Sequence, residues 1–205
     1  LDYSSDTHNE GTATYFREYL RQFLTASEPE RDNYADKYAY NIDKMMWDNN
    51  PYYGWINKNK RSDGTKYNLY KDGLKIYVTL NSKLQKHAEA AVAQHMPALQ
   101  KKFNDHWKNS EPWSDDKSFI PLAIKRTERY RVMRAEGADD EEIKKAFATK
   151  HKMTVFGHNG NIDTILSPLD SLKYYKFFAQ TGFLSMSPKT GAIKAWVGGI
   201  NHTYF

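Results

Sequence analysis

The stretch SPKTGAIKAWVGG, Ser187–Gly199, carries the clearest structural signal in the chain. Pro188 fixes one backbone dihedral and Gly191 can adopt a positive one, which predicts a reverse turn between them. After the turn, apolar residues alternate with other residues, as in a strand with one buried face: Ile193, Ala195 and Val197. Together with the preceding FLSM, the pattern predicts a hairpin over residues 183–198.

The letters Lys189-Thr190-Gly191 also spell a motif of serine enzymes that recognise penicillin. Because a lysine in a reverse turn points to water, we interpret Lys189 as the hairpin tip. Ser114 and Lys117 match a second motif, Ser-x-x-Lys, but Asp115 and Asp116 lie between them. Those carboxylates favour the charged ammonium, so Ser114 would be a poor nucleophile. Ser-x-Asn, the third motif, does not occur, and we expect no catalytic residue in the chain.

Upstream of the hairpin, the sequence predicts a strand followed by a long helix. Leu74, Ile76 and Val78 alternate with other residues within 66–80. Ser82 and Gln85 have the spacing of a capping box for a helix over 82–108, which Pro97 would kink. We therefore predict a helix-rich α+β fold whose small antiparallel sheet, made of 66–80 and the 183–198 hairpin, packs on this helix.

The segment before the strand is rich in aromatic residues. Residues 12–24 have the apolar stripe of a docking helix, and a second helix is expected over 34–47. A long loop then contains four rings, which are Trp47, Tyr52, Tyr53 and Trp55. These rings either pin the loop to its neighbours, the interpretation we favour, or form a stacking platform for a sugar or a base.

Between the long helix and the final hairpin, we expect helices over 119–150 and a hairpin over 152–166 with Asn159-Gly160 at its turn. Pro121 can occupy the first turn of a helix that runs to Gly137, and Asp139 with Glu142 forms a second capping box. A further helix is expected to begin after Ser167 and to end at Gly182.

Composition excludes several classes of function. Of the 205 residues, 40% are hydrophobic and 27% charged, which is a globular balance. The net charge of +5 is scattered, so no nucleic-acid partner is expected. The chain has no cysteine, which excludes disulfides and thiolate metal sites. The longest stretch without a charged side chain, Phe177–Pro188, is too short to span a bilayer.

No metal or cofactor is expected either. His87 and His95 are separated by two helical turns, roughly 12 Å along the axis, so they cannot bind one ion together. Four consecutive acids, Asp139–Glu142, fan around a helix start instead of facing one substrate. We interpret them as a charged first turn that suits the helix dipole.

Three stretches together resemble a known family. THNEGTATYFREYLRQFL, YKDGLKIYVTLNSKLQKHAEAAVAQHM and GFLSMSPKTGAIKAWVGG are similar to segments of the bifunctional class A penicillin-binding proteins, the glycosyltransferase/transpeptidases of bacterial cell walls. The first resembles the connection that leaves the glycosyltransferase domain, and the other two resemble the opening strand, helix and hairpin of the transpeptidase region. Residues 26–65 and 110–170 look like insertions of the kind seen in proteins of the Bacteroidetes group.

The resemblance implies a linker over 1–65 and the N-terminal part of a transpeptidase domain over 66–205, with an insertion at about 110–170. It places the family's Ser-x-x-Lys beyond Phe205 and its glycosyltransferase glutamates before Leu1. The chain is then expected to be a non-catalytic scaffold between the two flanking domains. The parent would lie on the periplasmic face of the inner membrane, anchored by an N-terminal helix outside this chain.

A second hypothesis remains open. In it, the chain is an interaction module whose aromatic loop or insertion binds peptidoglycan or a regulatory protein. Exposure of the rings in 47–55 would favour this hypothesis, whereas their burial against the 84–107 helix would favour the scaffold. In either case we expect a sheet without its later strands to expose an unpaired edge, which a dimer contact could cover.

Overall fold

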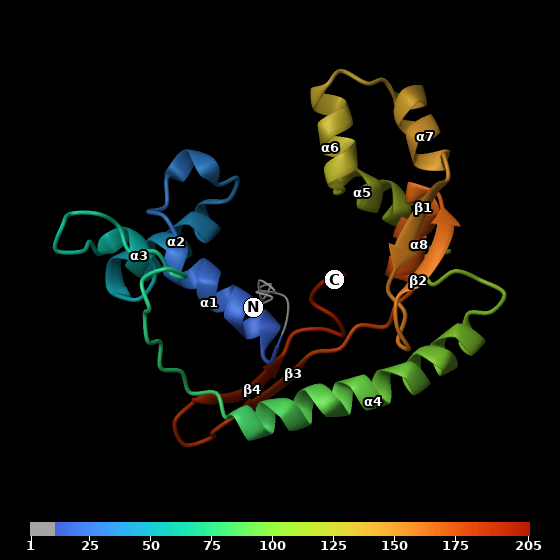
Figure 1. Cartoon of the computed structure of the whole chain (residues 1–205). Coiled ribbons are helices and arrows are strands. Elements are labelled where there is room, and N and C mark those ends of the chain that lie inside the picture. The colour runs from blue at the N-terminus through green and yellow to red at the C-terminus, as the bar shows by residue number, and fades with distance from the viewer. Residues whose placement is uncertain (1–10) are drawn as a thin grey trace, which may run out of the picture. The chain divides into compact units, whose positions relative to one another are not determined.

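The computed structural model describes residues 11–205, which form two compact units. Within the described residues, unit 1 contains everything up to Ala88 together with Gly182–Thr203 and Phe205, and unit 2 contains Glu89–Thr181 and Tyr204. Helices predominate, and two small antiparallel hairpins accompany them (Figure 1). The predicted α+β, helix-rich class is confirmed.

Unit 1 contains four complete helices, the start of a fifth and one hairpin. In chain order these are α1 (Thr14–Thr25), the short 3-10 helix η1 (Arg31–Asn33), α2 (Lys37–Asn49), α3 (Trp55–Lys58), the first turns of α4 (Ser82–His106), β3 (Phe183–Met186) and β4 (Ile193–Val197). The docking helix and the second helix of the sequence analysis are α1 and α2. Asp36 caps α2 by accepting from the backbone N–H groups of Tyr38 and Ala39.

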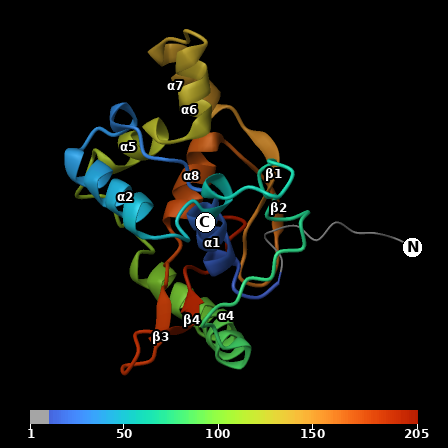
Figure 2. The ribbon, with the colours of Figure 1, turned by 90° about the vertical axis from the view of Figure 1, so that its left-hand side faces the viewer.

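The β3–β4 hairpin lies against the beginning of α4, as Figures 1 and 2 show. Gln85, with only 1% of its surface exposed, binds β4 through both ends of its amide. Its Nε2 donates to the carbonyl of Trp196 at 2.8 Å, and its Oε1 accepts from the N–H of Trp196 at 2.8 Å. One side chain thus satisfies the donor and the acceptor that a neighbouring strand would otherwise satisfy.

Helix α1 packs on β4 where that strand ends. Phe16 and Tyr19 contact Trp196, with ring centroids 5.9 and 5.2 Å apart respectively. Tyr15 lies on Gly198, where a Cβ atom would stand 2.7 Å from two carbons of the Tyr15 ring. Gly198 and Gly199, which follow β4, are therefore needed for the close approach of α1. Ala195 and Val197 of β4 are buried.

Unit 2 contains the rest of α4 followed by short helices and a hairpin. The elements are α5 (Phe119–Lys125), α6 (Glu128–Ala135), α7 (Asp140–Ala148), β1 (His151–Val155), β2 (Ile162–Leu166) and α8 (Pro168–Lys176). Ser167 caps α8, with Pro168 in its first turn, and the Asp139–Glu142 capping box of α7 is present as predicted.

The core of unit 2 joins the β1–β2 hairpin to α8. Phe156 is buried, and its backbone is held by two phenols: Tyr174 donates to its carbonyl at 2.6 Å, and its N–H donates to Tyr175 at 3.1 Å. Helix α4 contributes Gln100, which is also buried and uses both ends of its amide. It donates to the carbonyl of Phe177 at 3.1 Å and accepts from the N–H of Ala179 at 2.8 Å.

One predicted strand is absent, which corrects the sheet expected from sequence. Residues 66–80 form no strand beyond the single bridge between Lys60 and Lys66, and near their end the hydroxyl of Thr79 donates to the carbonyl of Ile193 in β4 at 2.8 Å. Just after this segment, the N–H of Asn81 donates to the carbonyl of Lys194 at 2.9 Å, and the side chain of Gln85 donates to the carbonyl of Trp196. The outer edge of β4 is therefore closed before a third strand can extend along it.

Several element boundaries also differ from the expectation. The N-terminus of α4 is capped by Asn81, whose Oδ1 accepts from the N–H groups of Lys83 and Leu84, and not by a Ser82–Gln85 box. The helix expected from Pro121 to Gly137 is two helices, because Thr127 caps a new one. Helix α8 ends at Lys176, six residues before Gly182.

Candidate functional site

Unit 1 contains an apolar groove of about 470 Å³. Its walls come from three segments of the chain: α1, the aromatic loop with the first residue of α3, and the extended chain between α3 and α4. The lining residues are Leu20, Phe23, Leu24, Tyr52, Trp55, Leu69 and Leu74–Val78. Lys75 is the one charged member of this set. The groove therefore combines apolar side chains with two phenol hydroxyls, an indole N–H and one ammonium. Such a mixture is typical of sites that bind small molecules.

The aromatic loop is tied to α1 on one side of the groove. The N–H of Gly54 donates to the carbonyl of Phe23 at 2.8 Å, and the ring of Tyr53 packs edge-on against the ring of Phe23 at 5.3 Å. The amide of Asn57 donates to the carbonyls of Thr25 and Ala26. These bonds satisfy the carbonyls at the end of α1 and fix the position of Trp55 beside the groove.

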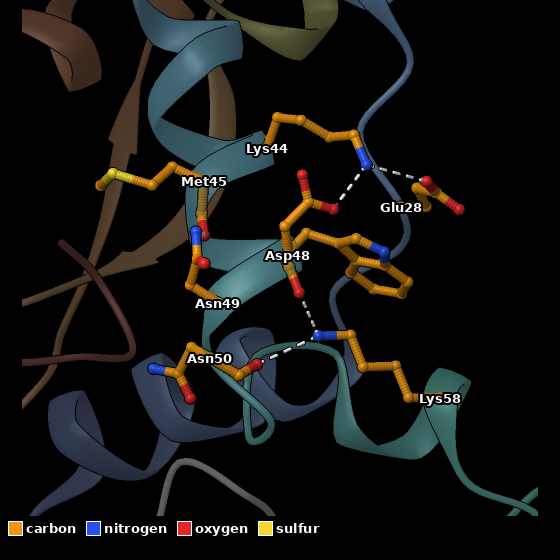
Figure 3. A network of polar contacts seen from close by, with 8 residues as sticks. Glu28, Lys44, Met45, Asp48, Asn49, Asn50 and Lys58 are labelled. Atoms are coloured by element: carbon orange, nitrogen blue, oxygen red, sulfur yellow. Dashed lines mark hydrogen bonds and ion pairs between the residues drawn. The ribbon is translucent and has the colours of Figure 1, made fainter.

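A polar network fixes the other end of the same loop (Figure 3). The ammonium of Lys58 donates to the carbonyls of Trp47 and Asn50, at 2.5 and 3.0 Å, and lies 4.4 Å from the centroid of the Trp47 ring. A lysine that binds the last carbonyls of a helix also suits the helix dipole, so Lys58 holds α2 and α3 together. Lys44 adds ion pairs to Glu28 and Asp48.

The four rings that the sequence analysis placed in one loop have different positions and roles, since Trp47 lies in α2 and Trp55 is the first residue of α3. Trp47 and Tyr53 are half-buried and hold the loop, as the favoured interpretation predicted. Their neighbours in these contacts are α1 and α3, and not the 84–107 helix. Tyr52 is 65% exposed and Trp55 is half-buried, and both line the groove. Trp47 and Tyr53 therefore favour the scaffold hypothesis, whereas Tyr52 and Trp55 favour the interaction-module hypothesis.

The Ser-x-x-Lys letters in residues 114–117 form no catalytic arrangement in the structure. Ser114 and Lys117 are both exposed in a polar turn, where the N–H of Ser114 donates to the carbonyl of Glu111. No hydrogen bond joins the two side chains within the described range 11–205. Glu111 instead pairs with Lys173 at 2.9 Å, and this bond lowers the pKa of its carboxyl group.

Lys189 lies at the exposed tip of the β3–β4 hairpin, as predicted. The N–H of Gly191 donates to the carbonyl of Ser187, and the N–H of Ser187 donates to the carbonyl of Ala192, both at 2.9 Å. Gly191 has a φ of 70°, which a glycine adopts without strain. The residues Lys189-Thr190-Gly191 therefore form a turn.

The histidines of α4 and the acidic cluster of α7 form no metal site among the described residues. His87 and His95 are exposed, and Asp139–Glu142 open α7, where Asp140 pairs with Arg134. In residues 11–205, no group of three or more histidine or acidic side chains could hold a metal ion. None of the described helices is long and apolar enough to cross a bilayer.

Sequence reasoning missed two features that shape unit 1. Gln85 was interpreted as part of a capping box, although a glutamine at a position spaced with the apolar face of a helix is also a signal for a buried amide. The groove itself was not predicted, because its lining joins residues more than fifty positions apart, from Leu20 to Val78.

Part of the chain is similar to a known protein family. Residues 104–179 match the family model of the penicillin-binding protein middle domain. This range lies within unit 2 and contains the whole segment, 110–170, that the resemblance treats as an insertion. The domain boundaries drawn from the sequence stay predictions. No curated protein and no solved structure matched the chain significantly. The family match supports a penicillin-binding protein and is consistent with cell-wall synthesis.

Proposed function

We propose that this chain is a non-catalytic scaffold segment of a bifunctional penicillin-binding protein that polymerises and cross-links peptidoglycan. The match of residues 104–179 to the penicillin-binding protein middle domain is the observation that carries the proposal. The stretches that resemble the transpeptidase opening, around Tyr70–Met96 and Gly182–Gly199, flank this match on both sides. Unit 1 would then contain the linker and the first transpeptidase elements.

The described residues support a scaffold in preference to a catalytic centre. Ser114 lies in an exposed turn without a bond to Lys117, and Lys189 points outward from a hairpin tip. A serine nucleophile needs a base within hydrogen-bond reach, and neither site offers one. The catalytic residues of the parent would lie outside this chain, and the parent would work on the outer face of the bacterial inner membrane.

A fluorescent penicillin tests this proposal directly. The 205-residue chain should remain unlabelled on a denaturing gel, whereas the chain extended past Phe205 to the end of the parent's transpeptidase domain should be labelled one to one. The Ser114→Ala variant serves as the control for adventitious labelling. Labelling of the 205-residue chain that Ser114→Ala abolishes would overturn the scaffold role. An extended chain that stays unlabelled would overturn the family assignment.

The groove favours a second candidate, an interaction module for glycan strands within the same synthase. Tyr52 and Trp55 line the groove, and sugars stack on aromatic rings. Soluble glycan strands should change the tryptophan fluorescence in a saturable way. Tyr52→Ala should weaken this binding, whereas Tyr38→Ala, an equally exposed tyrosine outside the groove, should not. No saturable change would exclude this candidate.

A further inference from the structure

The turn between β1 and β2 contains a histidine whose ring belongs to a cluster of aromatic side chains in unit 2. The centroid of the His158 ring lies 5.3 Å from that of Phe156 and 5.5 Å from that of Phe178. Phe156 and Phe178 also contact each other, with centroids 5.3 Å apart. The three rings are therefore in mutual contact, and the imidazole is the one member that can titrate.

One nitrogen of this imidazole is enclosed without a partner. Nε2 of His158 is buried, and within residues 11–205 it makes no hydrogen bond. The imidazolium ion carries an N–H on both ring nitrogens, so protonation would bury an unpaired, charged donor among apolar rings. Burial therefore lowers the pKa of His158 from its ordinary value of 6.5.

Neighbouring charges do not offset this cost. Among the described residues, no charged side chain contributes to the pKa shift of His158, which burial causes. The titratable groups of the cluster are phenols, since Tyr174 and Tyr175 bind the backbone of Phe156 and Tyr204 packs on Phe156. The charged and titratable side chains of β1, β2 and α8 face solvent or other partners: His151, Lys152 and Lys176 are exposed, Asp163 accepts from Thr154, Asp170 accepts from Ser167, and Lys173 pairs with Glu111.

The turn around His158 is short and depends on this ring for its contact with the cluster. The N–H of Gly160 donates to the carbonyl of Gly157 at 3.1 Å and closes the turn. Asn159 is exposed and both ends of the turn are glycines, so His158 supplies the side chain that contacts the aromatic rings. A change in the charge of His158 therefore acts directly on the attachment of the turn.

We propose that residues 157–160 form a pH-sensitive switch, in which protonation of His158 releases its ring from Phe156 and Phe178 and opens the turn. Release places both N–H groups of the imidazolium in water and exposes the two phenylalanine rings. Because the folded pKa is lowered, the contribution of His158 to the closed turn is fully present above pH 6.5. It is lost as the pH falls from 6.5 to the lower folded pKa. The inference concerns unit 2 and does not depend on the proposed function.

Hydrogen exchange of the 205-residue chain, expressed as protection factors, tests this switch together with an NMR titration of the His158 ring. The titration midpoint should lie below 6.5. The amides of Phe156 and Gly160 donate to Tyr175 and Gly157 respectively, and their protection should fall below pH 6.5 by up to about tenfold per pH unit. The Trp107 amide donates to the carbonyl of Phe103 elsewhere in unit 2 and should keep its protection.

Two variants complete the test. His158→Phe keeps an aromatic ring and removes the titration, so protection at Gly160 should become independent of pH between about pH 5 and 7. His95→Gln, at an exposed position of α4, should leave the pH response unchanged. The two measurements on the unsubstituted chain decide the proposal even if His158→Phe does not fold.

Four results would overturn the proposal. The first is a His158 ring that titrates at 6.5 or above, and the second is protection at Gly160 that does not change with pH. The third is an equal acid-induced loss at Trp107, which would mean that unit 2 unfolds as a whole. The fourth is a pH response that persists in His158→Phe.

Discussion

At the scale of single residues, the pair Tyr34 and Asp43 shows how one hydrogen bond changes the pKa of a side chain. The hydroxyl of Tyr34 donates to Oδ2 of Asp43 at 2.7 Å. This bond, followed by burial, raises the pKa of Tyr34 from 10.0 to about 12. The carboxylate accepts from the neutral phenol and would repel the phenolate, so ionisation of the tyrosine is opposed.

Replacement of the acceptor should return this tyrosine to its ordinary titration. In Asp43→Asn, we expect the pKa of Tyr34 to fall from about 12 towards 10, followed through its ring resonances by NMR. Because the folded pKa is raised, the bond stabilises the fold fully below pH 10 and loses this effect as the pH rises through 12. Asp48→Asn is the control, since Asp48 pairs with Lys44. An unchanged titration in Asp43→Asn would show that the bond is not formed.

At the scale of elements, the contact between α1 and the end of β4 depends on the absence of a side chain. Gly198→Ala would place a methyl group 2.7 Å from the ring of Tyr15, which is closer than real contacts allow. We expect a loss of roughly 1–3 kcal/mol in the free energy of unfolding, measured by urea denaturation.

A second glycine provides the matched control. Gly182→Ala places its methyl group 4.0 Å from the nearest atom, the carbonyl oxygen of Val197, so it should change stability by less than about 0.5 kcal/mol. Equal losses in the two variants would mean that α1 does not pack on β4 through Tyr15.

The elements that were predicted best from the sequence are those fixed by residues close to them in the sequence. The 183–198 and 152–166 hairpins and the Asp139–Glu142 capping box are confirmed, because turn and cap residues act over a few positions. The strand within 66–80 was wrong for a tertiary reason. Its alternation is present, but a strand needs a free edge, and Asn81 and Gln85 occupy the edge of β4.

The candidate site was only partly predictable for the same reason. All four rings were expected to pin the aromatic loop, and the structure confirms this for Trp47 and Tyr53. Which ring would remain accessible depends on where the extended 69–78 chain passes. No local pattern encodes that path, so the participation of Leu69 and Leu74 in one groove with Leu20 emerges only from the folded chain.

At the scale of the whole molecule, α4 serves each unit through one buried glutamine. Gln85 holds both backbone polar groups of Trp196 in unit 1, and Gln100 holds the carbonyl of Phe177 and the N–H of Ala179 in unit 2. Each amide satisfies one donor and one acceptor, so its loss leaves two backbone groups without a partner.

These two glutamines should affect different parts of the chain. Gln85→Leu should lose roughly 2–4 kcal/mol and lower the hydrogen-exchange protection of β4, whereas Gln100→Leu should lower the protection of the Ala179 amide. Gln94→Leu, an exposed position on the same helix, should leave both unchanged. If Gln85→Leu left the protection of β4 intact, the amide clamp on Trp196 would not exist.

The hairpin tip at Pro188–Thr190 has a practical consequence. It is exposed and is closed by two backbone bonds of its own, so no side chain of either core depends on it. Chains tolerate added segments best at such places. A short epitope or a fluorophore-labelling tag inserted after Lys189 would report on this protein in living cells while leaving its packing undisturbed.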